Sequence, residues 1–313
     1  MSQETAVSVV DTAEQAFEAR LLALVLNGVT SVHSRRSYRT SLVRFFSWIR
    51  TSGSGPNFTK ALVGEYRAAL LEAGLSPATL NLRLAPIRRL AREMADNGLL
   101  DPAVAAAIER VPGVTRRGTR LGNWLTKEQA NDLLNAPDPK TLAGKRDRAI
   151  LALLIGCGLR RAELLRLDVE SLQQREARWV IPDMEGKGNR VRTVTVPAGV
   201  KARIDLWTNA AFITEGRIFR PVTKAGVVKG SAILDEKVVW RLVVRYARET
   251  ELGKLAPHDL RRTCAKLCRK AGGDLEQIQL LLGHASVQTT ERYLGTEQAL
   301  VQAVNDGLGL DLG

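Results

Sequence analysis

The chain has 313 residues, 45% hydrophobic and 25% charged, which is typical of a globular protein long enough for two domains. Its 46 lysines and arginines outnumber 33 acidic residues, and the net charge of +13 favours a polyanionic partner such as nucleic acid. The longest apolar run, 149–159, is too short to cross a bilayer, and acidic residues interrupt the N-terminus where a signal peptide would be apolar. We therefore expect a soluble, intracellular protein.

Apolar residues recur at helical spacing through most of the first 111 residues, which predicts an all-helical first domain. Ser76 and Pro77 suit the cap and the first turn of its fourth helix. Pro86 lies inside that helix and predicts a kink or a break. The expected helices are 11–27, 31–52, 59–73, 77–97 and 102–111.

Arginines accompany the apolar stripes of the second and fourth expected helices. Most basic helix faces are simply solvated, but several in one small domain favour contacts with DNA phosphates. The candidate contacts are Arg35, Arg36, Arg39, Arg83, Arg88 and Arg89.

A linker is expected at 112–122, which holds one proline, three glycines and three arginines without hydrophobic periodicity. It divides the chain into a helical DNA-binding domain, 1–111, and a second domain, 123–313. The basic linker is either solvated or follows a nucleic-acid backbone, and we include Arg116 and Arg117 among the candidate DNA contacts.

The second domain opens at Thr126, which has Gln129 at the spacing of a capping box. Helices are expected at 127–135 and 145–157. Arg160 and Glu163 follow, three residues apart and on one helical face. Such pairs usually lie on the surface and have no function. The apolar residues around Arg160, however, favour a partly buried, functional arginine.

Two β-branched runs, 178–182 and 191–197, predict strands joined by a glycine-flanked hairpin tip that carries Lys187. A lysine at such a tip is either a solvated side chain or one that reaches a ligand and donates a proton. Helices are expected to resume at 200–211 and 233–249.

The stretch from Pro257 to Leu294 concentrates the groups that can hold and attack a phosphodiester. We expect a helix from His258, with Arg261 and Arg262 on the same side; spacing alone does not choose between these two arginines. A second helix, 275–282, should end at Gly283, with His284 exposed just beyond it. Ser286 should cap a last helix that carries Tyr293, although a tyrosine near a helix end is more often a packing residue.

The three cysteines cannot form a complete disulfide framework, and each lies in an apolar or helical context, so we expect reduced, buried thiols. Three cysteines and three histidines also do not build a four-ligand zinc centre, and we expect no metal site. The cysteines are Cys157, Cys264 and Cys268.

Five motifs then stand in an order that resembles the signature of the tyrosine recombinase and integrase family, with its Xer-type, phage integrase and Cre-like members. They are Arg160 with Glu163, Lys187 between glycines, His258-Asp-Leu-Arg261, Leu-Gly-His284 and Tyr293. The resemblance covers about 126–294. It implies a mainly α fold with a small β-sheet, in which an N-terminal helical core-binding bundle precedes a mixed α+β catalytic domain.

The resemblance implies that Arg160 and Arg261 grip the scissile phosphate. Guanidinium suits this role because it stays protonated and binds phosphate with two hydrogen bonds. His284 would donate a hydrogen bond to a phosphate oxygen, and Glu163 would orient the site. No metal or other cofactor is implied, since the arginines supply the positive charge.

The resemblance also implies that Tyr293 attacks the phosphorus and forms a 3′-phosphotyrosyl intermediate. Lys187 would protonate the 5′-oxygen leaving group as general acid, and His258 would act as base or hydrogen-bond partner. A type IB topoisomerase uses related chemistry and is the alternative enzyme. The complete residue set argues against a third class, a non-catalytic DNA-binding regulator.

The expected partner is double-stranded DNA with specific sites, bound in the cytoplasm, near the nucleoid, of a bacterial or phage-type system. The target sequence and the biological role stay open between integration, dimer resolution and movement of a mobile element. An apolar stripe at Ala299, Leu300, Ala303 and Val304 either packs on its own domain or, as the resemblance implies, docks into a neighbour in a homotetramer on two duplexes.

Overall fold

The computed structural model describes residues 3–52, 57–115, 123–186, 191–230, 232–284 and 286–294, without the side chains of 3–14, 292 and 293. The chain divides into two compact units, 1–119 and 120–313. Each unit has its own hydrophobic core.

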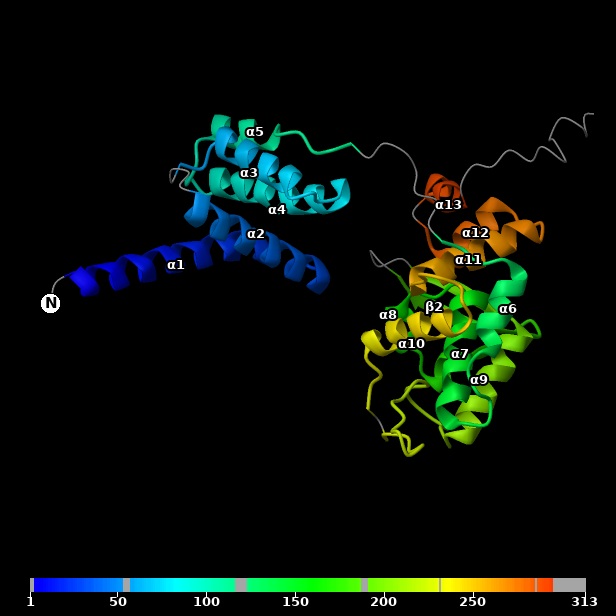
Figure 1. The fold of residues 1–313 in the computed structure, drawn as a ribbon. Coiled ribbons are helices and arrows are strands. Elements are labelled where there is room, and N and C mark those ends of the chain that lie inside the picture. Colours follow the sequence, from blue (N-terminus) through cyan, green and yellow to red (C-terminus); the bar gives the residue numbers. More distant parts are fainter. Residues whose placement is uncertain are drawn as a thin grey trace, which may run out of the picture. The chain divides into compact units, whose positions relative to one another are not determined.

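The first unit is built from helices, as expected (Figure 1). Side-chain caps set several of their starts: Thr59, Ser76 and Asp101 each accept a hydrogen bond from a backbone N–H of the following turn. Apolar side chains of α1, α2, α4 and α5 meet in its core. The helices are α1 (Gln3–Asn27), α2 (Val32–Ser52), α3 (Lys60–Glu72), α4 (Pro77–Asp96) and α5 (Pro102–Glu109).

Two expectations for these helices need correction. Helix α1 begins at Gln3 and not at Asp11. Helix α4 runs without a break through Pro86, so the alternative of a break is wrong. A proline removes one helical hydrogen bond, but Pro86 is buried, and burial of its ring counteracts part of that loss.

The first residues of the expected linker are docked on α4. The carbonyl of Val111, a buried residue, accepts a hydrogen bond from Arg88 at 2.6 Å. Asn81 pairs with the backbone of Val114 through two hydrogen bonds of 2.9 Å. A Cβ atom added to Gly113 would lie 2.5 Å from the Asn81 side-chain oxygen, so any other residue there would displace Asn81. Residues 111–114 are therefore part of the folded surface of the first unit.

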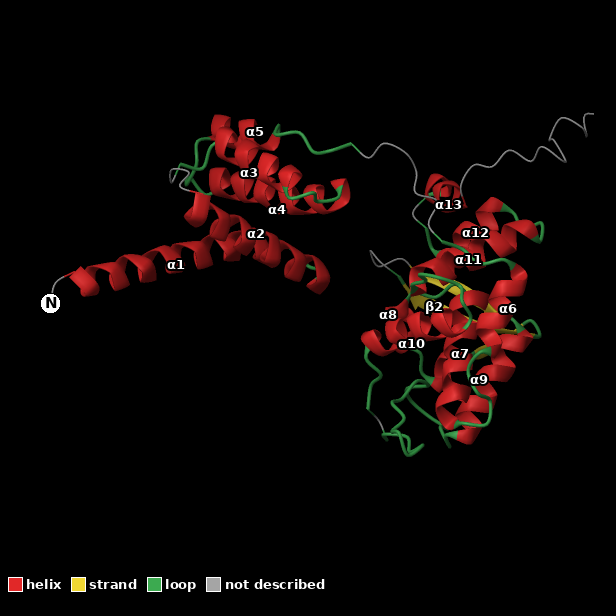
Figure 2. Ribbon diagram, in the orientation of Figure 1, coloured by secondary structure: helices red, strands yellow, loops and turns green. Residues whose placement is uncertain are grey.

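The second unit places a small antiparallel sheet among helices (Figure 2). Its strands are β1 (Gln173–Arg175), β2 (Arg178–Glu185) and β3 (Val191–Val196), in the order β1-β2-β3. Val180 pairs with Thr195, and the register shifts between Ile181 and Met184. The mainly α fold with a small sheet is thus confirmed.

The core of the second unit forms around α7, an almost wholly buried helix. It packs against α9 and α11, and its buried Asp147 accepts hydrogen bonds from Arg146, Arg245 and Tyr246, which tie α10 to it. The helices of this unit are α6 (Lys127–Asn135), α7 (Leu142–Gly156), α8 (Arg161–Leu165), η1 (Val169–Ser171), α9 (Ala198–Ala210), α10 (Glu236–Glu249), α11 (Pro257–Lys270), α12 (Leu275–Leu282) and α13 (Val287–Leu294).

Candidate active site

Glu163, whose side chain is 1% exposed, lies at the centre of the site. It is the third residue of the short helix α8, and from there its carboxylate reaches back to the residue that precedes the helix. It accepts hydrogen bonds from the backbone N–H of Arg160 at 2.8 Å and from the Arg160 guanidinium at 2.6 Å. The Arg160 side chain keeps 30% of its surface exposed. The structure thus brings these two predicted residues together.

Arg192 of β3 is a member of the site that the sequence analysis missed. Its two terminal nitrogens pair with the two carboxylate oxygens of Glu163, at 3.1 and 2.9 Å, and its Nε donates to the carbonyl of Leu281 at 2.9 Å. The side chain is only 7% exposed. A signal existed: Arg192 alternates with the buried Val194 and Val196, which places a charge on the inward face of a strand.

Arg261 enters the site from α11, with 1% of its side chain exposed. Its guanidinium donates to the backbone carbonyls of Gly158 and Leu282, and one terminal nitrogen lies 3.9 Å from Glu163. Arg262, by contrast, pairs with Asp259 of its own helix at 3.8 Å. The geometry therefore separates two arginines that helical spacing could not.

The charges around Glu163 fix its protonation state. Burial alone would raise the pKa of the carboxyl, but hydrogen bonds from Arg192 and from the Arg160 backbone, and the charges of both arginines, lower the pKa to about 2. Glu163 is thus anionic at neutral pH. Three guanidinium groups approach one carboxylate, which leaves excess positive charge where an anion could bind.

His284 is buried, and the expectation that it would be exposed is wrong. Gly283 adopts a left-handed conformation with φ of 61°, and the N–H of His284 then bonds back to the Gln279 carbonyl. This reversal turns the imidazole inward, where its Nδ1 lies 3.0 Å from Oγ1 of Thr290. Burial, and then the charges of Arg261 and other nearby groups, lower the pKa of His284 to about 4.

His258 lies in the first turn of α11 and remains exposed at the surface. Partial desolvation of its ring, followed by the charges of Arg261 and Arg262, lowers the pKa of this histidine. Arg160 acts on it in the same direction, and His258 in turn acts on His284. These mutual effects place both histidines in one electrostatic environment with the arginines.

Two side chains predicted to be catalytic lie outside the described residues. Lys187 belongs to residues 187–190, between the end of β2 and the start of β3. The backbone of Tyr293 is part of α13, three residues after Thr290, but its side chain lies outside the described residues. The structure thus assembles Arg160, Glu163, His258, Arg261 and His284 and gives the chain positions of the other two.

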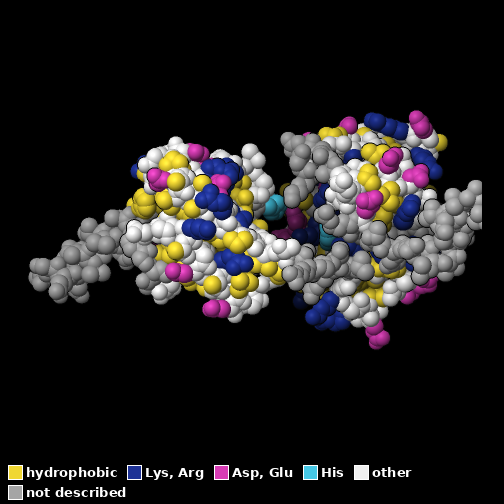
Figure 3. All heavy atoms as spheres, turned by 90° about the horizontal axis from the view of Figure 1, so that it is seen from above, with side chains coloured by type: hydrophobic (Ala, Val, Ile, Leu, Met, Phe, Trp, Pro, Cys, Tyr) yellow, Lys and Arg dark blue, Asp and Glu magenta, His cyan; other side chains and the backbone are white. Residues whose placement is uncertain are grey.

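The arginines proposed to contact DNA differ in their surroundings. Among the described residues, Arg35, Arg36 and Arg39 are exposed on α2 with no ion pair. Arg88 and Arg89 instead donate to backbone carbonyls of their own unit, those of Val111 and Gly28, and Arg83 interacts with the buried Tyr66. Figure 3 shows basic side chains standing among apolar ones on this unit. Arg116 and Arg117 lie outside the described residues.

The cysteines are free thiols, with Cys157 and Cys264 buried but Cys268 only half-buried, contrary to expectation. Within the described ranges, no three histidine, cysteine or acidic side chains are grouped so as to hold a metal ion. No described helix is long and apolar enough to cross a membrane.

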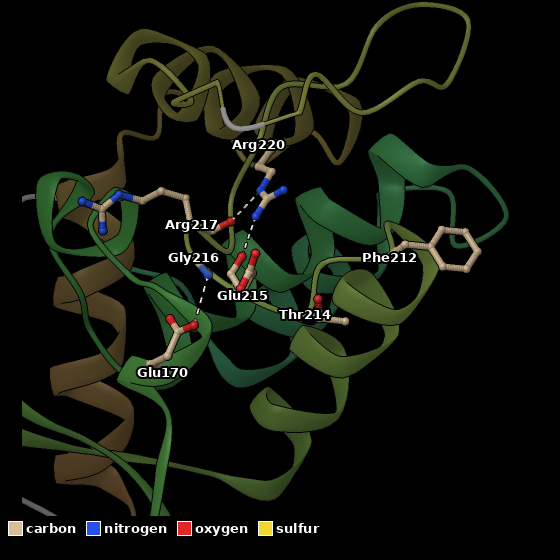
Figure 4. Close-up of a pocket in the computed structure, with 7 residues that line it drawn as sticks. All are labelled: Glu170, Phe212, Thr214, Glu215, Gly216, Arg217 and Arg220. Atoms are coloured by element: carbon tan, nitrogen blue, oxygen red, sulfur yellow. Dashed lines mark hydrogen bonds between the residues drawn. The ribbon is translucent and has the colours of Figure 1, made fainter.

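A pocket of about 540 Å³ lies between η1 and the segment after α9 (Figure 4). Arg220 donates to the carbonyls of Glu215 and Arg217, and Glu170 accepts from the N–H of Gly216 at 3.2 Å. The Phe212 ring points away from this group (Figure 4). None of the residues that line this pocket belongs to the candidate site.

Two family models match the chain. The phage integrase family matches residues 123–299, and the N-terminal SAM-like domain of phage integrases matches residues 19–98. The chain therefore belongs to the phage integrase family.

Curated relatives agree over nearly their full length. Tyrosine recombinase XerD of Pseudomonas putida is 29% identical, over 90% of this chain and 93% of the relative. Tyrosine recombinase XerC of Mycobacterium bovis is 32% identical, over 90% of this chain and 94% of the relative. The chain is accordingly a site-specific recombinase of the tyrosine type.

Solved structures share the fold. The XerH recombinase bound to a palindromic difH substrate, a post-cleavage complex, has a TM-score of 0.67 at 20% identity and covers 86% of this chain and 78% of its own. A lambda integrase dimer bound to a COC′ core site has a TM-score of 0.66 at 15% identity, over 90% of this chain and 77% of its own.

Proposed function

We propose that the site around Glu163 binds the scissile phosphodiester of double-stranded DNA, and that Tyr293 attacks it. The observation that carries this proposal is the approach of three guanidinium groups to a single buried carboxylate. A phosphodiester would bring the missing negative charge. XerH and lambda integrase are described as bound to DNA sites, which supports the same partner for this chain.

Arg160 and Arg261 are proposed to hold the non-bridging oxygens. Glu163 engages Arg160 while 30% of that side chain stays exposed to a ligand. Arg261 is held by two backbone carbonyls and would present its charge from a fixed position. Charge that develops on the phosphate in the transition state would then meet cations already in place, at no cost of reorganisation.

The covalent step joins the phenol oxygen of Tyr293 to phosphorus and breaks the bond to the 5′-oxygen. Lys187 is proposed to give that oxygen a proton. The lowered pKa of His258 keeps its imidazole neutral at neutral pH, so it can accept the phenol proton. Attack by a 5′-hydroxyl of the partner strand reverses each step and rejoins the DNA. The arginines provide the charge, so the proposed reaction has no cofactor step.

We further propose that the protein acts as a homotetramer on two duplexes, in the cytoplasm at the nucleoid. The apolar stripe of Ala299, Leu300, Ala303 and Val304, which lies outside the described residues, would dock into a neighbouring subunit. Deletion of the residues after Gly295 should then impair recombination more than DNA binding. Equal loss of both activities would argue against this role.

Covalent capture tests the chemistry. The full-length protein is incubated with a pool of nicked duplexes with randomised centres, denatured, and probed for protein-linked DNA, which is then sequenced to find the site. Wild type should form an adduct and Tyr293→Phe should form none. An adduct with Tyr293→Phe, or none with wild type, contradicts the proposal. Exchange between two captured sites, compared with relaxation of a plasmid lacking the site, separates a recombinase from a topoisomerase.

A further inference from the structure

Thr290 of α13 makes a buried contact with His284. Its side chain is fully buried, and its Oγ1 lies 3.0 Å from the Nδ1 of the imidazole. This hydrogen bond joins the turn after α12 to α13, the helix that carries Tyr293. Its direction decides what the other ring nitrogen can do.

A neutral imidazole carries one N–H, on either Nδ1 or Nε2. If Nδ1 carried it, Thr290 would accept the hydrogen bond, and Nε2 would be unprotonated and could only accept one. If Thr290 donates, Nε2 carries the proton and becomes a donor. A phosphate oxygen only accepts hydrogen bonds, so only the second arrangement lets a neutral His284 bind it.

The hydroxyl proton of Thr290 favours the second arrangement. Other helical threonines of this chain donate to the carbonyl four residues earlier: Thr208 to Ile204, Thr250 to Tyr246, and Thr263 to Asp259. Within the described part of the chain, Thr290 has no such carbonyl partner, and the His284 nitrogen is its hydrogen-bond contact. A buried hydroxyl that only accepted would leave its proton unsatisfied, which proteins avoid.

We infer that Thr290 is a positioning residue that donates its hydroxyl proton to Nδ1 and so holds His284 in the Nε2–H form. This rests on the proposed function only in assigning the Nε2–H to a phosphate oxygen. The pKa of about 4 at His284 agrees with a neutral ring at working pH. The charged or titratable groups that act on this ring are Arg261, Arg160, His258 and Arg192. Because Thr290 precedes Tyr293 by three residues, one helix would set both the phosphate donor and the nucleophile.

The experiment reads the tautomer directly. The full-length protein is labelled with 15N in its imidazoles, and the three histidines are assigned with His33→Gln, His258→Gln and His284→Gln. At neutral pH, His284 of wild type should show a protonated Nε2 and an unprotonated Nδ1. Thr290→Val, which keeps the shape but not the hydroxyl, should give a mixture of tautomers, and Thr290→Ser should restore the wild-type pattern.

Covalent adduct formation provides the second readout. Thr290→Val should slow it in proportion to the fraction of the Nε2–H form that is lost, about 2-fold for an equal mixture; Thr290→Ser should recover most of the rate. A wild-type His284 protonated at Nδ1, or an unchanged tautomer in Thr290→Val, overturns the inference. A mixture of tautomers in Thr290→Val with a wild-type rate upholds the inference. That result would instead show that the Nε2–H of His284 has no role in the proposed mechanism. If Thr290→Val does not fold, the wild-type and Thr290→Ser spectra still decide.

Discussion

Arg192 illustrates how a site depends on a buried residue whose guanidinium is held by other groups of the protein. All three of its guanidinium nitrogens are used within the protein, two by Glu163 and one by the carbonyl of Leu281. It therefore acts through the groups it holds: the carboxylate that orients Arg160, and the turn that leads to His284. In the sequence, it follows Lys187 by only five residues.

Replacing Arg192 with lysine keeps the charge but removes the planar fork that matches the carboxylate. We expect the single-turnover cleavage rate to fall about 10²-fold, the effect of a small misplacement of catalytic groups, while the Kd for DNA changes little. Arg178→Lys, at the exposed start of β2 in the same sheet, is the matched control. A wild-type cleavage rate in Arg192→Lys would show that the fork does not matter.

His284 predicts a pH dependence of stability. Its pKa is about 4 in the folded protein and about 6.5 in an unfolded chain. The unfolded state binds more protons between these values, so a contribution of up to about 3 kcal/mol is present above pH ~6.5 and is lost as the pH falls towards ~4. Urea unfolding at both pH values should show a smaller pH effect in His284→Gln. Parallel pH profiles in the two proteins would refute this assignment.

At the scale of elements, the docking of residues 111–114 on α4 determines where the chain leaves the first unit. It depends on Gly113, because any Cβ there meets Asn81. Gly113→Ala should displace Asn81, break its two hydrogen bonds to Val114 and lower the free energy of unfolding by about 1–2 kcal/mol. Gly64→Ala is the control, since Gly64 lies inside α3 with open space around its Cα and should gain about 0.5–1 kcal/mol. Thermal unfolding of both variants measures the contrast.

Elements with strong local signals could be predicted from the sequence. The capping box of Thr126 and Gln129 fixes the start of α6, and both hydrogen bonds of the box are present. Strand β1 could not be found this way, because its three polar residues carry no periodicity and it forms by pairing with β2. Arg146 and Asp147 are of residue types that are seldom buried, and tertiary packing buries both.

The candidate site likewise has features that the sequence predicted and features that depend on tertiary structure. The order of Arg160, Glu163, Arg261 and His284 in the sequence resembles that of the family, and this resemblance named them as candidates. The burial of His284 could not be foreseen, because it follows from the left-handed Gly283 and from the helix that covers it. Helical spacing did not separate Arg261 from Arg262, whereas the structure does so through Glu163, about a hundred residues earlier in the chain.

At the scale of the whole molecule, the net charge of +13 predicts strongly salt-dependent DNA binding. Arg35, Arg36 and Arg39 are exposed on α2, so their combined replacement by glutamine should reduce the slope of log Kd against log salt by about 2–3. Fluorescence anisotropy with a short labelled duplex of arbitrary sequence measures this. Arg92→Gln is the control, because Arg92 already pairs with Glu109. An unchanged slope in the triple variant would exclude a phosphate-binding role for these residues.

The crowding of three guanidinium groups around Glu163 has a consequence for the protein in the absence of DNA. Repulsion among the cations opposes folding, and a small oxyanion that enters the site relieves it. Sulfate should therefore raise the melting temperature more than chloride at equal ionic strength and should also inhibit strand cleavage competitively. Arg160→Gln should shrink both effects, which separates site binding from the general stabilisation that sulfate gives to proteins. Inorganic anions in the buffer would thus act on folding and on catalysis through the same residues.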